Sequence, residues 1–224
     1  MHIGLIGGIG PAATEFYYRG LIGRHTKAGT APDLTIVHAD VRDMARNLAR
    51  NAAQDQAEIF ARLIRRLANA GAVLAAVTSM GGHFCIRELT AISPLPLLNA
   101  IPEVDAAVRE RNLRTIGIIG TRNVMETGLY GGITAARIVR PEGEALDEVH
   151  SAYITMAGEG TVTEDQRGVF FSAGRRLCDE QGAEAVVLGG TDLFLAFAGQ
   201  NCGFPVIDCA DIHVDALYRR STSP

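Results

Sequence analysis

Short apolar runs rich in β-branched residues alternate along the chain with longer amphipathic stretches, and glycines bound many of these runs. This alternation is typical of βα units arranged around a mostly parallel sheet, so it predicts an α/β fold. The predicted strands cover residues 2–7, 33–39, 73–79, 96–100, 115–120, 136–141, 185–190 and 205–209.

Two amphipathic stretches predict long helices, over residues 52–71 and 163–182. The first ends on Gly71, which suits the position just after a helix, where glycine is favoured. The second begins at Thr163, a residue type that caps helix N-termini, and stops at Gly182.

The chain also repeats itself in order. "IGLIGG" at 3–8 returns as "IGIIGT" at 116–121, a shift of 113. "GAVLAAVTS" at 71–79 returns as "GAEAVVLGG" at 182–190, a shift of 111. "PLLNA" at 96–100 returns as "PVIDC" at 205–209, a shift of 109. These matches predict two similar halves, each with a mostly parallel four-stranded sheet flanked by helices.

We delimit the two predicted domains as residues 1–98 with 208–224, and residues 99–207. The shift of 111 sets Ser79 opposite Gly190. Ligands bind outside the carboxyl ends of strands in parallel α/β sheets. We therefore expect the corresponding strand ends of the two halves to form one cleft between the domains.

Composition excludes several classes of partner. The 224 residues carry 21 Lys and Arg against 25 Asp and Glu, and no basic cluster is interleaved with aromatic residues. Nucleic acid and anionic membrane are therefore not expected partners. No apolar run reaches the ~18 residues of a membrane span, and the N-terminal stretch lacks the pattern of a signal peptide, so we expect a cytoplasmic protein. The four cysteines lack CxxC spacing, which argues against a structural zinc site or a redox pair.

A glycine-rich turn, "GGIGPAAT" at 7–14, follows the first predicted strand. Ala13 stands where a dinucleotide-binding motif has its third glycine, and the acidic residue of that motif is missing at its usual distance. Two interpretations stay open: backbone N–H groups that hold a carboxylate at a helix N-terminus, or a structural tight turn. Thr14 either adds a hydroxyl group to an anion site or is an ordinary helix residue.

Polar side chains follow both of the repeated strands. "TSMGGH" at 78–83 supplies Ser79 and His83, but a serine nucleophile needs a neighbouring base, and no G-x-S-x-G motif is present. "GGTDL" at 189–193 supplies Thr191 and Asp192, of which Asp192 is also suited to capping a helix. His213 on the last predicted helix is either a structural or a pocket histidine.

At these residues the sequence resembles the aspartate/glutamate racemase family. "IGLIGGIGPAAT" is similar to that family's "GIIGGMGPxAT", and "IGIIGTRNVMETGLY" at 116–130 to its "GLLGTxxTMxxGxY". "GAEAVVLGGTDL" is similar to "GADAVILGCTEL", and "FPVIDCADIHVDAL" to the closing strand and histidine-bearing helix. The resemblance implies two pseudo-symmetric α/β domains, an active site between them, a homodimer, a small amino acid or carboxylic acid as substrate, and no cofactor or metal.

The resemblance also implies proton abstraction from the α-carbon of an amino acid by one thiol and reprotonation by another. A thiol with a pKa near 8.5 suits this task far better than an alcohol. The first thiol lies four residues before the family's histidine, which places Ser79 at that position, and the second corresponds to Gly190. Cys85 and Cys209 are near these motifs along the chain but belong to other predicted elements.

Three functions stay open. The first is a racemase or epimerase in which Ser79, His83 or Asp192 carries protons in place of thiols. The second is another reaction of the family, namely a lyase, decarboxylase or cis–trans isomerase, which needs only one acid/base group. The third is a binding subunit for a small acid. Removing a proton-transfer group commonly costs ~10²–10⁴-fold in rate, so efficient two-thiol racemisation is not expected.

The candidate site therefore has two groups of residues. The acid/base candidates are Ser79, His83, Thr191 and Asp192. The substrate-binding candidates are Gly8, Gly10, Pro11, Thr14, Thr78, Met80, Gly81, Gly82, Thr121, Gly190 and His213.

An arginine that the family frequently has in "PDRT" is Leu34 in this chain. A carboxylate partner implied by the resemblance is therefore missing. Arg42, Arg46 and Arg122 are candidate substitutes, although solvated arginines are the ordinary interpretation.

Overall fold

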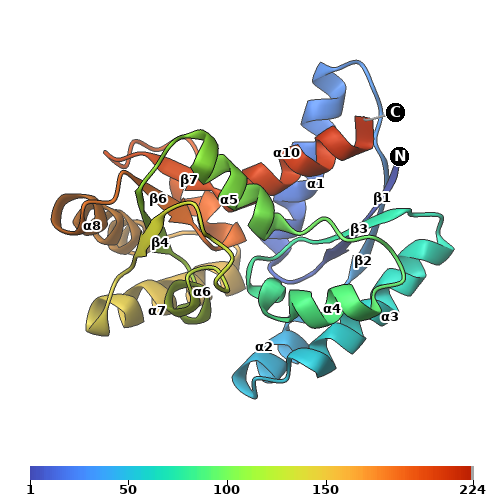
Figure 1. Cartoon of the computed structure of the whole chain (residues 1–224), viewed down its shortest axis with the longest axis horizontal. Coiled ribbons are helices and arrows are strands. Elements are labelled where there is room, and N and C mark those ends of the chain that lie inside the picture. The colour runs from blue at the N-terminus through green and yellow to red at the C-terminus, as the bar shows by residue number, and fades with distance from the viewer. Residues whose placement is uncertain (223–224) are drawn as a thin grey trace. The chain divides into compact units, whose positions relative to one another are not determined.

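The computed structural model describes residues 1–222, which form two compact units. The first comprises Met1–Asn99 together with the chain from His213 onward, and the second comprises Ala100–Ile212. Each unit contains one parallel sheet with helices packed on it, as predicted for an α/β chain (Figure 1).

The first unit has a three-stranded parallel sheet in the order β2-β1-β3. Its strands are β1 (His2–Gly7), β2 (Asp33–His38) and β3 (Leu74–Val77). Its helices are α1 (Pro11–Lys27), α2 (Val41–Ala49), α3 (Ala53–Asn69), the 3₁₀ turn η1 (Gly81–Cys85), α4 (Ile86–Ile92) and the part of α10 (Cys209–Thr222) from His213 onward.

The second unit has a four-stranded parallel sheet in the order β5-β4-β6-β7. Its strands are β4 (Thr115–Ile119), β5 (Arg137–Val139), β6 (Ala185–Leu188) and β7 (Val206–Asp208). Its helices are α5 (Ala100–Glu110), α6 (Arg122–Thr127), α7 (Gly143–Glu159), α8 (Glu164–Gln181), the 3₁₀ turn η2 (Thr191–Leu193) and α9 (Phe194–Phe197).

The predicted fourth strand of the first unit, residues 96–100, is wrong as a strand. Only a single bridge joins Leu97 to Ala75, through the hydrogen bonds from Ala75 N to Pro96 O and from Leu98 N to Ala75 O, both 2.9 Å. Pro96 has no N–H to donate to a ladder, and α5 begins at Ala100. The segment is therefore too short and too poor in donors to extend the sheet.

The predicted internal repeat is confirmed by strand register. Ile6 pairs with Val77 in the first sheet, and Ile119 pairs with Leu188 in the second. These pairs are related by the same shifts of 113 and 111 that the sequence gives. Both sheets also carry a glycine under the leucine of a covering helix. A Cβ atom at Gly4 would lie 2.8 Å from Leu67 Cδ1, and one at Gly117 would lie 2.9 Å from Leu177 Cδ1.

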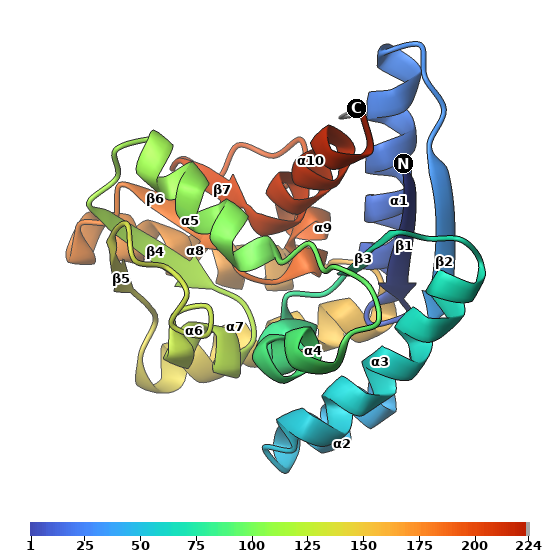
Figure 2. The same cartoon turned by 45° about the vertical axis from the view of Figure 1, so that its right-hand side comes forward.

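Both predicted long helices are confirmed. α3 is followed by Gly71, which has a φ of +95°, and α8 ends at Gly182, which has a φ of +72°. Thr163 caps α8 by accepting a hydrogen bond from the backbone N–H of Gln166. In Figure 2, α3 runs along the sheet of the first unit, where Phe60, Ile64 and Leu67 are buried.

The last helix brings distant parts of the chain together. From His213 onward α10 lies beside α1 in both views (Figures 1 and 2), where the ring centroids of His25 and Tyr218 are 5.1 Å apart. Within residues 1–222, no helix has the length and apolarity that a membrane crossing needs.

Candidate functional site

In the first unit, the carboxyl end of β3 carries the predicted residues Thr78 and Ser79, both of which are buried. The Thr78 hydroxyl donates a hydrogen bond to Ile6 O at 3.0 Å, which ties β3 to β1. The Ser79 hydroxyl accepts a hydrogen bond from the backbone N–H of Gly82 at 3.3 Å. Thr78 therefore supports the sheet, whereas Ser79 keeps a hydroxyl proton with which to donate.

His83 binds the backbone carbonyl of Ser79. This contact does not activate the Ser79 hydroxyl as a base would. Its Nδ1 atom lies 2.7 Å from Ser79 O, and because a carbonyl only accepts, Nδ1 carries the proton. Burial lowers the pKa of His83 to about 4, and this hydrogen bond offsets part of the shift. The imidazole is therefore neutral at physiological pH, and it fixes the turn after β3.

His213 is buried beside His83 and is also neutral. Its Nε2 donates to Leu98 O at 3.0 Å, so its Nδ1 accepts the hydroxyl proton of Tyr17 at 2.8 Å. Burial, and to a smaller extent the adjacent His83, lower the pKa of His213 to about 3, and the hydrogen bond to Leu98 O offsets part of this shift. The His83 and His213 ring centroids are 5.9 Å apart.

The glycine-rich turn before α1 is held by Thr14. Gly8 and Gly10 have φ values of +87° and +85°, a left-handed conformation that glycine adopts without strain. The Thr14 hydroxyl accepts from Gly8 N at 2.9 Å and donates to Gly10 O at 3.2 Å, so its polar atom stabilises the turn. Among the described residues, the backbone N–H groups of Ile9 and Gly10 have no hydrogen-bond partner.

The second unit has a glycine, Gly190, after β6, and Tyr153 of α7 occupies the space that a side chain there would fill. Gly190 has an ordinary extended backbone with a φ of -125°. A Cβ atom at Gly190 would lie 2.2 Å from Cε2, 2.6 Å from Cζ and 2.8 Å from the hydroxyl oxygen of Tyr153. Packing against Tyr153, and not backbone strain, therefore explains the glycine.

The Tyr153 hydroxyl donates a hydrogen bond to Asp192 Oδ2 at 3.2 Å. Burial raises the pKa of Tyr153 well above 10, and the Asp192 charge raises it further. The phenol is therefore protonated over the whole physiological range. Beside this pair, the buried Thr191 hydroxyl interacts with Tyr153, which lowers the pKa of Tyr153 by less than burial and Asp192 raise it.

The other predicted site residues have varied surroundings. Thr121 caps α6 and accepts a hydrogen bond from Val124 N at 3.4 Å. Met80 is fully buried, Gly81 is half-buried, and Pro11 is exposed at the start of α1.

Burial favours the neutral thiol form of the two cysteines nearest these motifs. Burial raises the pKa of Cys85 to about 12, and its Sγ donates to Gly82 O at 3.5 Å. Burial likewise raises the pKa of Cys209 well above its usual value. Within residues 1–222, no three His, Cys, Asp or Glu side chains gather as a candidate metal site.

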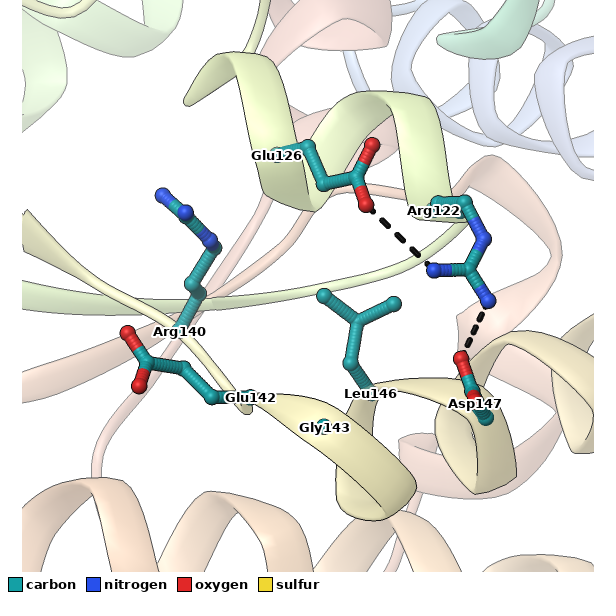
Figure 3. A pocket seen from close by; sticks show the side chains of 7 residues that line it. All are labelled: Arg122, Glu126, Arg140, Glu142, Gly143, Leu146 and Asp147. Carbon is teal, nitrogen blue, oxygen red and sulfur yellow. Dashed lines mark hydrogen bonds and ion pairs between the residues drawn. The ribbon is translucent and has the colours of Figure 1, made fainter.

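The three candidate arginines each have an acidic partner on the surface. Arg42 pairs with Asp40 at 2.6 Å, and Arg46 pairs with Asp43. Arg122 lines a charged hollow of about 380 Å³ between α6 and α7, shown in Figure 3, where it reaches both Glu126 and Asp147. A ligand carboxylate would compete with two protein carboxylates for Arg122, so this hollow is a poor carboxylate site.

Sequence reasoning missed Tyr17 and Tyr153. Neither belongs to a strand-end motif, and their partners His213 and Asp192 are 196 and 39 positions away. The one available signal for Tyr153 was the glycine at position 190, because a missing side chain in a buried site implies a neighbour that fills the space.

The sequence and the fold match a known class of proteins. The model of the Asp/Glu/hydantoin racemase family matches residues 6–217, so the chain belongs to this family. A Yersinia pestis protein provisionally described as an Asp/Glu racemase is 25% identical, with a TM-score of 0.85 and 100% of each chain covered.

Two archaeal structures share the fold at lower identity. An aspartate racemase homologue from Pyrococcus horikoshii is 22% identical, with a TM-score of 0.78 and 99% of each chain covered. The aspartate racemase of Picrophilus torridus is 17% identical, with a TM-score of 0.78 and 99% of this chain and 94% of that chain covered.

Proposed function

We propose that this protein catalyses cofactor-independent proton transfer at the α-carbon of a small amino acid that bears a carboxylate. The observation that carries the proposal is the pair of polar strand ends, after β3 and after β6, in a chain of the racemase family. The family resemblance further supports a homodimer and a cytoplasmic location as parts of this proposal.

The substrate carboxylate is assigned to the glycine-rich turn. The two N–H groups of Ile9 and Gly10 have no protein partner among the described residues, and the positive end of the α1 dipole lies at the same turn. Backbone donors of this kind take the place of the arginine that is Leu34 in this chain. Thr14 contributes indirectly by holding Gly8 and Gly10 in their left-handed conformation.

The acid/base groups are assigned to the side chains at the two strand ends. Ser79 is the candidate after β3, and Thr191 with Asp192 are the candidates after β6. His83, which is neutral and bound to Ser79 O, positions the Ser79 backbone. An alcohol with no adjacent base is a weak proton acceptor, so we expect slow turnover compared with a thiol-based enzyme.

A specific observation favours a second candidate, a decarboxylase, lyase or isomerase that needs one proton donor. The two strand ends are chemically unequal: Ser79 has no base on its hydroxyl, whereas Asp192 accepts a hydrogen bond from a buried phenol. A racemase uses both of its groups as acid and as base in turn. Unequal groups are better suited to a reaction that proceeds in one direction.

The two candidates are separated by proton NMR in D₂O with aspartate, glutamate and α-substituted malonates. Loss of the α-proton signal without new peaks supports racemase-type exchange, and new product peaks support the second candidate. Ser79→Ala is expected to lower exchange by ~10²-fold or more. Unchanged exchange in Ser79→Ala would remove Ser79 from the mechanism. A ligand that raises the melting temperature without any reaction would instead support a binding protein.

A further inference from the structure

We infer that the Tyr153 hydroxyl is the proton donor at the carboxyl end of β6, in the place of a side chain at position 190. This inference rests on the proposed function and identifies one of its acid/base groups. It assigns a role to a residue of α7 that lies outside every strand-end motif.

The first step is spatial. Any side chain at Gly190 would start 2.2 to 2.8 Å from Tyr153 Cε2, Cζ and hydroxyl oxygen, so the phenol fills the volume into which that side chain would project. Because α7 supplies the ring across this position, the strand end carries a hydroxyl group despite its glycine. Parallel α/β sheets bind ligands at this end of their strands.

The second step concerns neighbouring polar atoms. Tyr153 is 6% exposed, yet its hydroxyl has a charged acceptor in Asp192 Oδ2 at 3.2 Å. The Thr191 hydroxyl oxygen is also buried, and it interacts with the Tyr153 hydroxyl. A phenol, a carboxylate and a threonine hydroxyl thus cluster at the carboxyl end of β6, which is the end at which parallel sheets bind ligands.

The third step is chemical. Burial and the Asp192 charge oppose ionisation of Tyr153, so its phenol stays protonated and is a weaker acid than a free phenol. A carbanion is far more basic than a phenolate, so it still takes this proton. In the proposed step a new C–H bond forms at the α-carbon, the Tyr153 O–H bond breaks, and its electron pair stays on the phenol oxygen. Water returns the proton before the next turnover.

The fourth step links the donor to the reaction class. Two enantiomers have an equilibrium constant of one, so a racemase must protonate and deprotonate with equal overall efficiency in both directions. The phenolate that would have to accept a proton is scarcely populated in a buried site beside Asp192, so Tyr153 does not meet this requirement well. Loss of CO₂ from a malonate leaves a carbanion that needs only a donor, so the Tyr153 assignment favours the second candidate function.

The test compares wild type with Tyr153→Phe, which keeps the ring and removes the hydroxyl. The reactions are run in D₂O with L- and D-aspartate and with methylphenylmalonate. We expect product formation or inversion to fall ~10²–10⁴-fold, while exchange at the α-carbon with retained configuration persists within tenfold. Any product of malonate cleavage is expected to become racemic, because water then delivers the proton. Tyr18→Phe, at an exposed tyrosine of α1, is the matched control and should behave as wild type.

Full inversion or stereoselective product in Tyr153→Phe would overturn the assignment, and so would equal loss of exchange and product, which indicates a structural role. A wild-type protein that does not react with any of these substrates overturns the proposed function and this inference with it.

Asp192→Asn provides a second test that keeps the Tyr153 hydroxyl: removing the Asp192 charge lowers the pKa of Tyr153. The alkaline loss of product formation should then move to lower pH, and an unmoved profile contradicts the assignment.

Discussion

At the scale of single residues, one glycine and one tyrosine define what is unusual about this chain. Gly190 removes the side chain that family resemblance assigns to proton transfer, and Tyr153 fills the vacated space from another element. The glycine at position 190 and the placement of Tyr153 are therefore two parts of one packing arrangement. A thiol cannot be restored at this strand end unless the phenol moves.

Gly190→Cys is therefore expected to destabilise the protein. The new Cβ would lie 2.2 Å from Tyr153 Cε2, and overpacking of a buried site costs about 1–3 kcal/mol. Urea unfolding of the purified variant measures this loss. The control is Gly158→Ala, on the same helix as Tyr153, where a Cβ meets no atom within 4 Å and alanine improves helix propensity by up to ~1 kcal/mol. Equal stability of Gly190→Cys and wild type would show that Tyr153 does not fill this space.

Ser79→Cys tests the strand end after β3 by introducing a thiol there. The substitution is nearly isosteric, and a thiol has a far lower pKa than an alcohol, so α-proton exchange is expected to rise at least tenfold. NMR exchange rates for Ser79→Cys, wild type and Ser79→Ala should fall in that order, and the alanine variant should be nearly inactive. A cysteine variant no faster than wild type would place the base at another residue.

At the scale of elements, the two halves that repeat in sequence also repeat a helix–sheet packing contact. Gly4 under Leu67 on α3 corresponds to Gly117 under Leu177 on α8, and both leucines are buried. Each glycine allows its covering helix to approach the sheet closely. The two halves of the chain therefore use the same contact to place β1 and β4, the strands that pair with β3 and β6.

This correspondence predicts matched energetic costs. Leu67→Ala and Leu177→Ala each leave a cavity over a glycine and should each destabilise the protein by about 2–5 kcal/mol. Chemical denaturation followed by circular dichroism measures both losses. A cost below about 1 kcal/mol for either variant would show that the two contacts are not equivalent in energy.

The elements predictable from sequence were those with a local signal. Hydrophobic runs marked β1 and β4, and Thr163 and Gly182 marked the ends of α8. The segment at 96–100 has the same apolar character, yet Pro96 lacks a ladder donor and α5 begins at Ala100. The strand-end residues Ser79 and Asp192 were found for the same local reason. Tyr153 contacts Asp192, and Tyr17 contacts His213, through tertiary packing, which a motif does not encode.

At the scale of the whole molecule, buried neutral histidines make stability depend on pH. The folded-state pKa values of His83 and His213 are about 4 and about 3, both below the ordinary 6.5. Above pH 6.5 their contribution to stability is complete. As pH falls below 6.5, the unfolded chain binds protons that the folded chain does not, and stability is lost by up to about 1.4 kcal/mol per pH unit for each histidine.

Asp208 opposes part of this loss. Burial raises its pKa from 3.8 to about 6, so the folded state binds its proton more readily and gains stability as pH falls through that range. The net expectation between about pH 6 and 4 is a decline of roughly 1 kcal/mol per pH unit. Urea unfolding at pH 7.5, 6 and 5 measures it, and His83→Gln should flatten the slope. A protein equally stable at pH 7.5 and 5 would show that these histidines are not buried in their neutral form.

The central claim is that a racemase-family chain without thiols at its two strand ends still performs proton chemistry next to a carboxylate. The most direct measurement is proton NMR of the wild-type protein in D₂O with aspartate, glutamate and α-substituted malonates, following α-proton loss and new peaks together. We predict slow reaction of at least one of these compounds. Complete inertness of every compound, with a folded protein in the tube, would contradict the claim.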